Sequence, residues 1–152
     1  MKTMILLDHL GYSQANYELF RSINKLVEET LEEISVVPID RTNKIIPLKT
    51  AATNIGSMSA FNGGLLVSTT IKNAERILAC KTRTSKLLYL YDLEWMYKKI
   101  PYDNIYSILN DPSLFVVLRS RSHVEAFRQI SHKRELGIVD EFRLEEIWNL
   151  LE

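Results

Sequence analysis

An acidic pair follows one of the most apolar runs in the chain. Asp92 and Glu94 come directly after residues 87–91, a run rich in Leu and Tyr that is typical of a strand buried on both faces. A carboxylate at the end of such a strand can be partly desolvated and act as a general base, so Asp92 is the candidate catalytic residue. The neighbouring Trp95 is a candidate platform for stacking on a sugar ring. The alternative interpretation is that Asp92 caps a loop, that Glu94 is solvated, and that the indole packs in the core or at its rim.

A second polar group follows residues 114–118, the next strand-like run. It contains Arg119, Ser120 and His123, which together could bind an anion or a sugar hydroxyl. Adjacent parallel strands end at the same edge of a sheet, and open α/β folds bind their ligands there. We therefore expect this group to share one cleft with the acidic pair. The alternative for His123 is an exposed position in a first helical turn.

Ser13 gives a third candidate chemistry. Residues 11–15, Gly-Tyr-Ser-Gln-Ala, come close to the Gly-x-Ser-x-Gly nucleophile elbow, and Ser13, Asp92 and His123 occur in the chain order of α/β-hydrolases. A true elbow places its serine on the turn directly after a strand, whereas residues 8–12 intervene here. We therefore favour Ser13 as a helix N-cap, whose hydroxyl oxygen accepts a hydrogen bond from a free backbone N–H. A small serine hydrolase remains the alternative.

Several other chemistries find no support in the sequence. Neither a G-x-G-x-x-G fingerprint after the first strand nor a Walker A motif occurs. The three histidines lack the spacing of metal ligands, and Cys80 is the only cysteine. Residues 68–70, at the end of the third strand-like run, are Ser-Thr-Thr, where a phosphoacceptor receiver domain would place an aspartate. We therefore expect no cofactor and no metal.

The charge balance and the length limit the class of protein. Nineteen basic and 19 acidic residues cancel, which argues against a nucleic-acid binder. No apolar run is long enough for a transmembrane helix or a signal peptide, so we expect no membrane association. A single cysteine forms no internal disulfide and favours a reducing, cytoplasmic location. A chain of 152 residues corresponds to one domain, residues 1–152.

Apolar periodicity predicts which elements position these residues. The predicted strands are residues 4–7, 34–39, 65–67, 86–91, 114–118 and 137–139. The predicted helices are residues 13–31, 71–78, 101–109, 122–130 and 144–151. Ser122 and Glu125 match a capping box at the start of the fourth of these helices.

Residues 41–62 are the least readable part of the chain. Residues 45–48 could form a short edge strand, because Pro47 is tolerated at an edge. We expect residues 51–61 to be a loop with at most one helical turn. Strands that alternate with helices imply right-handed crossovers. The predicted fold is therefore a three-layer α/β Rossmann-like domain with a mainly parallel sheet of five to seven strands.

Five segments in this order resemble a known family. The chain is similar to the N-terminal, acceptor-side Rossmann-like domain of GT-B-type glycosyltransferases, in the form found in phage and marine sequences. The segments that carry the resemblance are DHLGYS, GGLLVSTTIKNAERIL, KLLYLYDLEW, LFVVLRSRSHVEAF and GIVDEFRLEEIWNLL. The resemblance covers most of the chain and is weakest over residues 41–61.

The resemblance implies an α/β domain whose strand-end loops face an interdomain cleft and bind a saccharide or a glycosylated acceptor. By position, the residues that would line the cleft are His9, Gly11, Asp92, Glu94, Arg119, Ser120 and His123. A GT-B enzyme has a second domain that holds the nucleotide-sugar, whereas this chain ends at Glu152. We therefore expect no transfer by this chain alone, with a donor site supplied by a separate protein or a homodimer. The alternative is a noncatalytic interaction module, which could be homodimeric.

Overall fold

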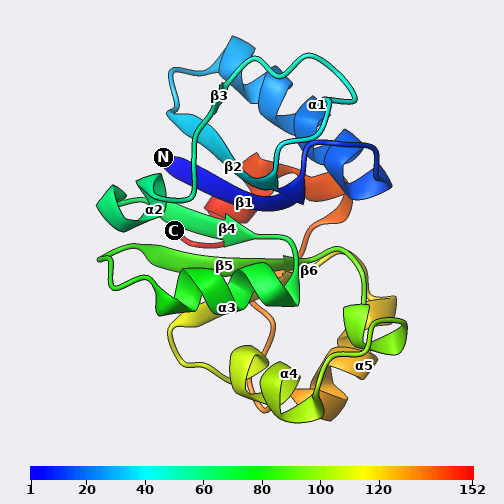
Figure 1. Cartoon of the computed structure of the whole chain (residues 1–152). Helices are drawn as coiled ribbons and strands as arrows, with labels where there is room; N and C mark the ends of the chain where they lie inside the picture. The colour runs from blue at the N-terminus through cyan, green and yellow to red at the C-terminus, as the bar shows by residue number, and fades with distance from the viewer.

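Seven parallel strands form a single sheet with helices on both faces (Figure 1). The computed structural model describes all residues, 1–152. The strands are β1 (Thr3–His9), β2 (Ile34–Asp40), β3 (Ala51–Ala52), β4 (Leu65–Ser68), β5 (Ser85–Leu90), β6 (Leu114–Leu118) and β7 (Gly137–Ile138). The helices are α1 (Gln14–Glu29), α2 (Ser57–Ala60), α3 (Ile71–Ala79), α4 (Tyr102–Leu109), α5 (Ser122–Ile130) and α6 (Leu144–Asn149), with 3-10 turns η1 (Glu94–Met96) and η2 (Asp140–Phe142). The predicted three-layer α/β Rossmann-like fold is confirmed.

The strand order is β3-β2-β1-β4-β5-β6-β7. From β1 the chain adds β2 and β3 on one side. It then crosses to the other side of β1, where it adds β4, β5, β6 and β7 in order. This reversal between β1 and β4 is the topological switch point, where two crossover connections leave the sheet in opposite directions. Open α/β sheets bind ligands just beyond the strand ends at this point.

Alternation along β5 explains why its apolar run has no polar face. Leu87 and Tyr89 point into one core, which is closed by α1 and α6, whereas Leu88 and Leu90 point into the other, which is closed by α3, α4 and α5. All four side chains are fully buried. The strand needs apolar residues on both faces because helices cover both faces.

The predicted edge strand at residues 45–48 is wrong. The edge strand is β3, which pairs with β2 a few residues later, within the segment that was expected to be a loop. Ile45, Ile46 and Leu48 instead pack against the core on the α1 side of the sheet. The Asn24 side chain of α1 holds this segment by donating to the Pro47 carbonyl at 2.7 Å. The expected helical turn is confirmed as α2.

Three helix ends differ from their predictions, and one of them is the end of α6, which lies at Asn149 and not at residue 151. Thr30 terminates α1, so Leu31 lies outside the helix and is fully exposed instead of joining the apolar stripe. The capping box at α5 does not form, because Arg121 occupies the N-cap position and Ser122 is already the first residue of the helix. The Ser122 hydroxyl instead forms a hydrogen bond of 2.7 Å with the Ser120 hydroxyl. None of the helices combines the length and the apolar character needed to cross a bilayer.

Candidate functional site

A pocket of about 190 Å³ lies beyond the carboxyl ends of β1, β4 and β5, at the switch point. We call it the switch-point pocket. Three segments line it: the end of β1 with the start of α1, the β4–α3 turn, and the segment after β5. Its lining residues are Asp8, His9, Ser13, Ala15, Asn16, Thr69, Thr70, Tyr91, Asp92, Glu94, Tyr97 and Lys98.

The pocket brings together four of the residues selected from the sequence, namely His9, Ser13, Asp92 and Glu94. The other five do not line it, and these are Gly11, Trp95, Arg119, Ser120 and His123. The acidic pair therefore shares its pocket with the loop after β1 and not with the loop after β6. β6 is adjacent to β5, so the strand order alone would allow a shared pocket, but Arg119 after β6 contacts the Tyr91 ring and does not line the pocket.

Each of the five excluded residues has another environment. The Arg119 guanidinium carbon lies 4.2 Å from the centre of the Tyr91 ring, a cation–π contact. Trp95 is partly buried against the core that α3, α4 and α5 close. The Gly11 carbonyl accepts from the Asn16 side chain at 2.9 Å. Ser120 bonds to its neighbouring serine, as described above, and His123 is half-buried with its Nδ1 atom unpartnered.

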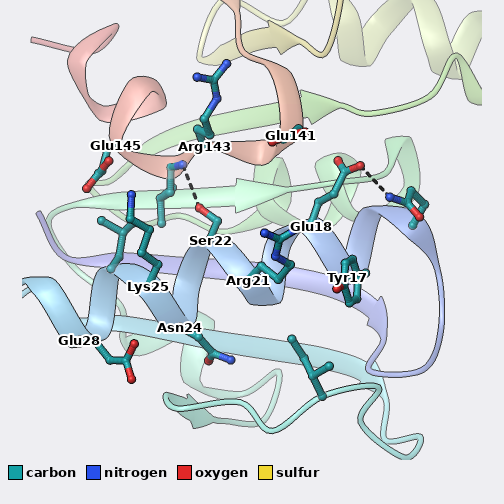
Figure 2. Close-up of a pocket in the computed structure, with 14 residues that line it drawn as sticks. Tyr17, Glu18, Arg21, Ser22, Asn24, Lys25, Glu28, Glu141, Arg143 and Glu145 are labelled. Atoms are coloured by element: carbon teal, nitrogen blue, oxygen red, sulfur yellow. Dashed lines mark hydrogen bonds between the residues drawn. The ribbon is translucent and has the colours of Figure 1, made fainter.

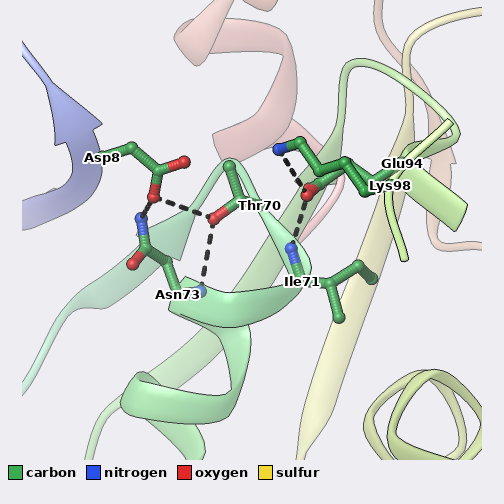
Figure 3. A network of polar contacts seen from close by, with 6 residues as sticks. All are labelled: Asp8, Thr70, Ile71, Asn73, Glu94 and Lys98. Carbon is green, nitrogen blue, oxygen red and sulfur yellow. Dashed lines mark hydrogen bonds and ion pairs between the residues drawn. The ribbon is translucent and has the colours of Figure 1, made fainter. Parts of the chain in front are cut away.

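Glu94 is buried and connects the start of α3 to Lys98 (Figure 3). The residue is 4% exposed, and its Oε1 accepts from the backbone N–H of Ile71, the first residue of α3, at 2.8 Å. Its Oε2 pairs with the Lys98 ammonium at 3.0 Å. Burial alone would lower the pKa of Lys98, but hydrogen bonding to Glu94 raises it above its ordinary value. Both Glu94 oxygens are thus engaged within the protein, which leaves little capacity for a ligand.

Asp8 is the second carboxylate at the start of α3 (Figure 3). Its Oδ1 accepts from the Asn73 side-chain amide at 2.7 Å and from the Thr70 hydroxyl at 3.3 Å. The Thr70 oxygen in turn caps α3 by accepting from the Asn73 backbone N–H at 3.2 Å. Asp8 and Glu94 together place two negative charges at the positive end of the helix, which is a favourable arrangement.

Asn16 organises the loop between β1 and α1. The residue is 7% exposed, and its side-chain amide donates to the carbonyls of His9 and Gly11, each at 2.9 Å. Its backbone N–H donates to the Ser13 hydroxyl oxygen at 3.0 Å, so the predicted N-cap at Ser13 is confirmed. These bonds fix the loop that presents His9 to the pocket.

The electrostatics of the pocket disfavour anions. Its three carboxylates, at Asp8, Asp92 and Glu94, outnumber the single ammonium of Lys98, which gives a net charge of −2 with His9 neutral. Two of the N–H groups in the first turn of α3, those of Ile71 and Asn73, are already bound to Glu94 and Thr70. A phosphate at a helix N-terminus needs such groups to be free.

Two tyrosines form the aromatic part of the pocket. Tyr97 is 62% exposed, and burial of its hydroxyl together with the Asp92 charge raises its pKa. Tyr91 is nearly buried, and its hydroxyl donates to Glu18 at 3.1 Å. Burial and this bond to Glu18 raise the pKa of Tyr91 to about 12. Both hydroxyls are therefore protonated at neutral pH, and Tyr97 offers an open ring at the mouth of the pocket.

A larger groove of about 520 Å³ runs between α1 and the η2–α6 segment (Figure 2). Two of its cations are already paired, Lys25 with Glu29 at 3.8 Å and Arg143 with Glu146 at 2.6 Å. The Ser22 hydroxyl accepts from the Leu144 N–H at 3.3 Å and joins the two walls. The groove runs along α1 on one face of the sheet and does not lie at the switch point between β1 and β4. We therefore place the candidate site in the smaller pocket.

No group of three or more His, Cys, Asp or Glu side chains is arranged to hold a metal ion. Comparisons with protein-family models, with curated proteins and with solved structures found no match for this chain.

Eight of the twelve pocket residues were not selected from the sequence, including Asp8, Tyr97 and Lys98, which carry ionisable groups. Asp8 follows an apolar strand directly, which is the same signal that selected Asp92, so it could have been found. Tyr97 and Lys98 carry no such signal, because η1 turns the chain back towards the pocket and nothing in the local pattern predicts that turn.

We expect a fluorophosphonate probe to leave Ser13 unlabelled. The Ser13 oxygen is committed to the first turn of α1, and no histidine makes a hydrogen bond to it. Without a base to remove its proton, a serine hydroxyl is a weak nucleophile. Mass spectrometry of the probe-treated protein checks this, with denatured protein as the control for nonspecific labelling. Stoichiometric labelling that is lost in Ser13→Ala would support the hydrolase alternative instead.

Proposed function

We propose that this chain is a saccharide-binding domain that serves as the acceptor side of a glycosyltransferase-like system. The observation that carries the proposal is the composition of the switch-point pocket, which combines ordered carboxylates with an exposed tyrosine ring at the edge of the sheet where α/β folds bind ligands. Sugar hydroxyls donate to carboxylates, and the apolar face of a sugar ring packs on an aromatic side chain. The resemblance to the acceptor-side domains of GT-B enzymes supports the same ligand class.

The charge of the pocket favours a neutral acceptor saccharide over a nucleotide-sugar donor. A nucleotide-sugar carries a diphosphate, which would face a net charge of −2, and the N–H groups of Ile71 and Asn73 at the start of α3 are already bonded. A neutral saccharide meets neither obstacle. We propose that the nucleotide-sugar is held by a second protein or by a second copy of this chain, and that Asp92 faces the acceptor there.

A titration with saccharides followed by amide NMR tests the proposed function. We expect neutral methyl glycosides to shift the amide resonances of His9, Asp92 and Lys98, whereas UDP-glucose and GDP-mannose leave them unchanged. Nucleotide-sugar binding in this pocket, with no response to any saccharide, would refute the assignment to the acceptor side. If the protein behaves as a dimer in sedimentation and no saccharide binds, the interaction module becomes the better interpretation.

Tyr97→Ala is expected to weaken saccharide binding about threefold to tenfold, because a sugar ring loses its stacking surface. Tyr102→Ala is the matched control, since the two tyrosines are similarly exposed, at 62% and 59%, and Tyr102 lies outside the pocket. The affinities of both variants are compared by the same NMR titration. Equal affinities would show that the ring of Tyr97 does not contact the sugar.

A further inference from the structure

The three carboxylates of the switch-point pocket differ in how much capacity they have for a ligand. Both oxygens of Glu94 are occupied by Ile71 and Lys98. Asp92 is exposed and lies near the Tyr97 hydroxyl. Because the Asp92 side chain is exposed, a ligand that binds it would have to order it, which costs conformational entropy. Asp8 alone is both held in place and partly free.

The orientation of Asp8 is set by a chain of hydrogen bonds. Arg76 donates to Oδ1 of Asn73 at 2.7 Å, and an arginine can only donate. The amide oxygen of Asn73 therefore faces Arg76, and the amide nitrogen faces Asp8. The Asn73 Nδ2 group donates to Asp8 Oδ1 at 2.7 Å. Asn73 is fully buried, so the amide cannot turn into solvent. The relay therefore holds the Asp8 carboxylate in one rotamer.

The other oxygen of Asp8 remains available. Oδ2 accepts no hydrogen bond from the protein, and it is not among the buried atoms that lack a partner, so it is open to solvent. In Figure 3 it points away from Asn73. Asp8 lines the pocket together with His9 and Lys98. An oriented acceptor of this kind binds a ligand hydroxyl without paying for the ordering of its own side chain.

We propose that Asp8 Oδ2 is the principal acceptor for a saccharide hydroxyl in the switch-point pocket, and that Asn73 is the residue that positions it. The inference rests on the proposed function and assigns the ligand contact to a residue other than Asp92. We therefore expect the pocket to select saccharides whose hydroxyl next to Asp8 is free to donate a hydrogen bond. Hydrogen bonds to a charged acceptor are among the stronger ones in proteins.

The first test is Asp8→Asn, which replaces Oδ2 or Oδ1 by an NH₂ group with nearly the same shape. The probes are the methyl α-glycosides of glucose, mannose and galactose, titrated against amide NMR spectra. We expect the affinity of the best probe to fall about tenfold to a hundredfold. Asp103→Asn, an exposed substitution in the first turn of α4, is the matched control and should leave the affinity unchanged.

The second test separates positioning by Asn73 from a merely structural role. Asn73→Ala should weaken binding of the same probe in the native background and have little further effect in the Asp8→Asn background, because both changes act through one contact. Equal losses in the two backgrounds would show that Asn73 acts through the fold and not through Asp8.

A measurement on the unmodified protein covers the case in which a variant does not fold. Carboxyl carbon NMR should show the Asp8 resonance moving as the probe is added, with the Asp103 resonance fixed. If the probe shifts the pocket amides but neither the Asp8 resonance nor the Asp8→Asn affinity changes, the inference fails while the proposed function stands. If no probe shifts the pocket amides, the proposed function fails, and the inference fails with it.

Discussion

Leu88→Ala is expected to lower the free energy of unfolding by about 2–4 kcal/mol. Leu88 lies on β5 between β4 and β6, is fully buried, and packs in the core that α3, α4 and α5 close. Replacing its isobutyl side chain by a methyl group leaves a cavity that the surrounding strands, which are hydrogen-bonded on both sides, cannot fill by moving together. Val116→Ala, on the adjacent β6, should act in the same direction with a smaller loss of volume.

Leu31→Ala is the matched control, because it makes the same chemical change at a fully exposed leucine. It should change the free energy of unfolding by less than about 0.5 kcal/mol. Urea denaturation followed by circular dichroism measures all three variants. An unchanged midpoint for both Leu88→Ala and Val116→Ala would contradict the placement of β5 and β6 at the centre of the fold.

The sheet could be predicted because its strands carry a strong signal. The run of residues 87–91 is apolar at every position, and an apolar run this short is typical of a strand covered on both faces. Residues 114–118 carry the same signal and pair with it in register. Alternation of such runs with amphipathic segments then leaves a parallel sheet as the simple solution.

The edge of the sheet could not be predicted for a physical reason. Residues 45–48 are as apolar as a strand, but their side chains bury against α1, whereas the actual strand β3 consists of two exposed alanines. A two-residue strand has no periodicity to detect. What fixes it is a tertiary contact, the hydrogen bonding of Asn24 to the backbone at Pro47 and Lys49, 23 to 25 positions away.

The candidate site was only partly predictable, because the sequence indicates where the strands end but does not give the complete strand order. Asp92 and Arg119 both follow apolar runs, and their strands are adjacent, yet Arg119 stacks on Tyr91 and does not line the pocket. Asp8 lies there because β1 is next to β4, a consequence of the reversal in strand order. Chain order gives no direct information on that reversal, so a pairing of Asp8 with the segment after β5 was not foreseen.

Tyr89→Phe is expected to destabilise the fold by about 1–3 kcal/mol, although it removes a single atom. The Tyr89 hydroxyl donates to the Val139 carbonyl at 2.7 Å and accepts from the Phe142 N–H at 3.1 Å, and the residue is fully buried. Both backbone groups would lose their partner without gaining water. The measurement is urea denaturation at pH 7, and Tyr102→Phe, which alters an exposed hydroxyl, is the control expected to have no effect.

The lost bonds matter more here because they hold a strained turn. Glu141 and Phe142 have φ values of 52° and 50°, in the left-handed region that costs a non-glycine residue roughly 1 kcal/mol or more. The Tyr89 hydroxyl and the edge-on contact between the Tyr89 and Phe142 rings, 4.5 Å apart, keep the turn in place. Amide hydrogen exchange should therefore accelerate in η2 and α6 of Tyr89→Phe before it does so in β5.

The same substitution should change the response to alkaline pH. Burial raises the pKa of Tyr89 well above its ordinary value of about 10. Above pH 10 the unfolded chain loses this proton while the folded protein keeps it, so the stability is complete below that pH and falls as the pH rises. Removing the hydroxyl should flatten this decline by up to about 1.4 kcal/mol per pH unit.

Some decline remains in Tyr89→Phe, because Tyr91, with its pKa raised to about 12, still titrates. Equal slopes for the two proteins between pH 10 and 11.5 would mean that the Tyr89 hydroxyl is not protected by the fold.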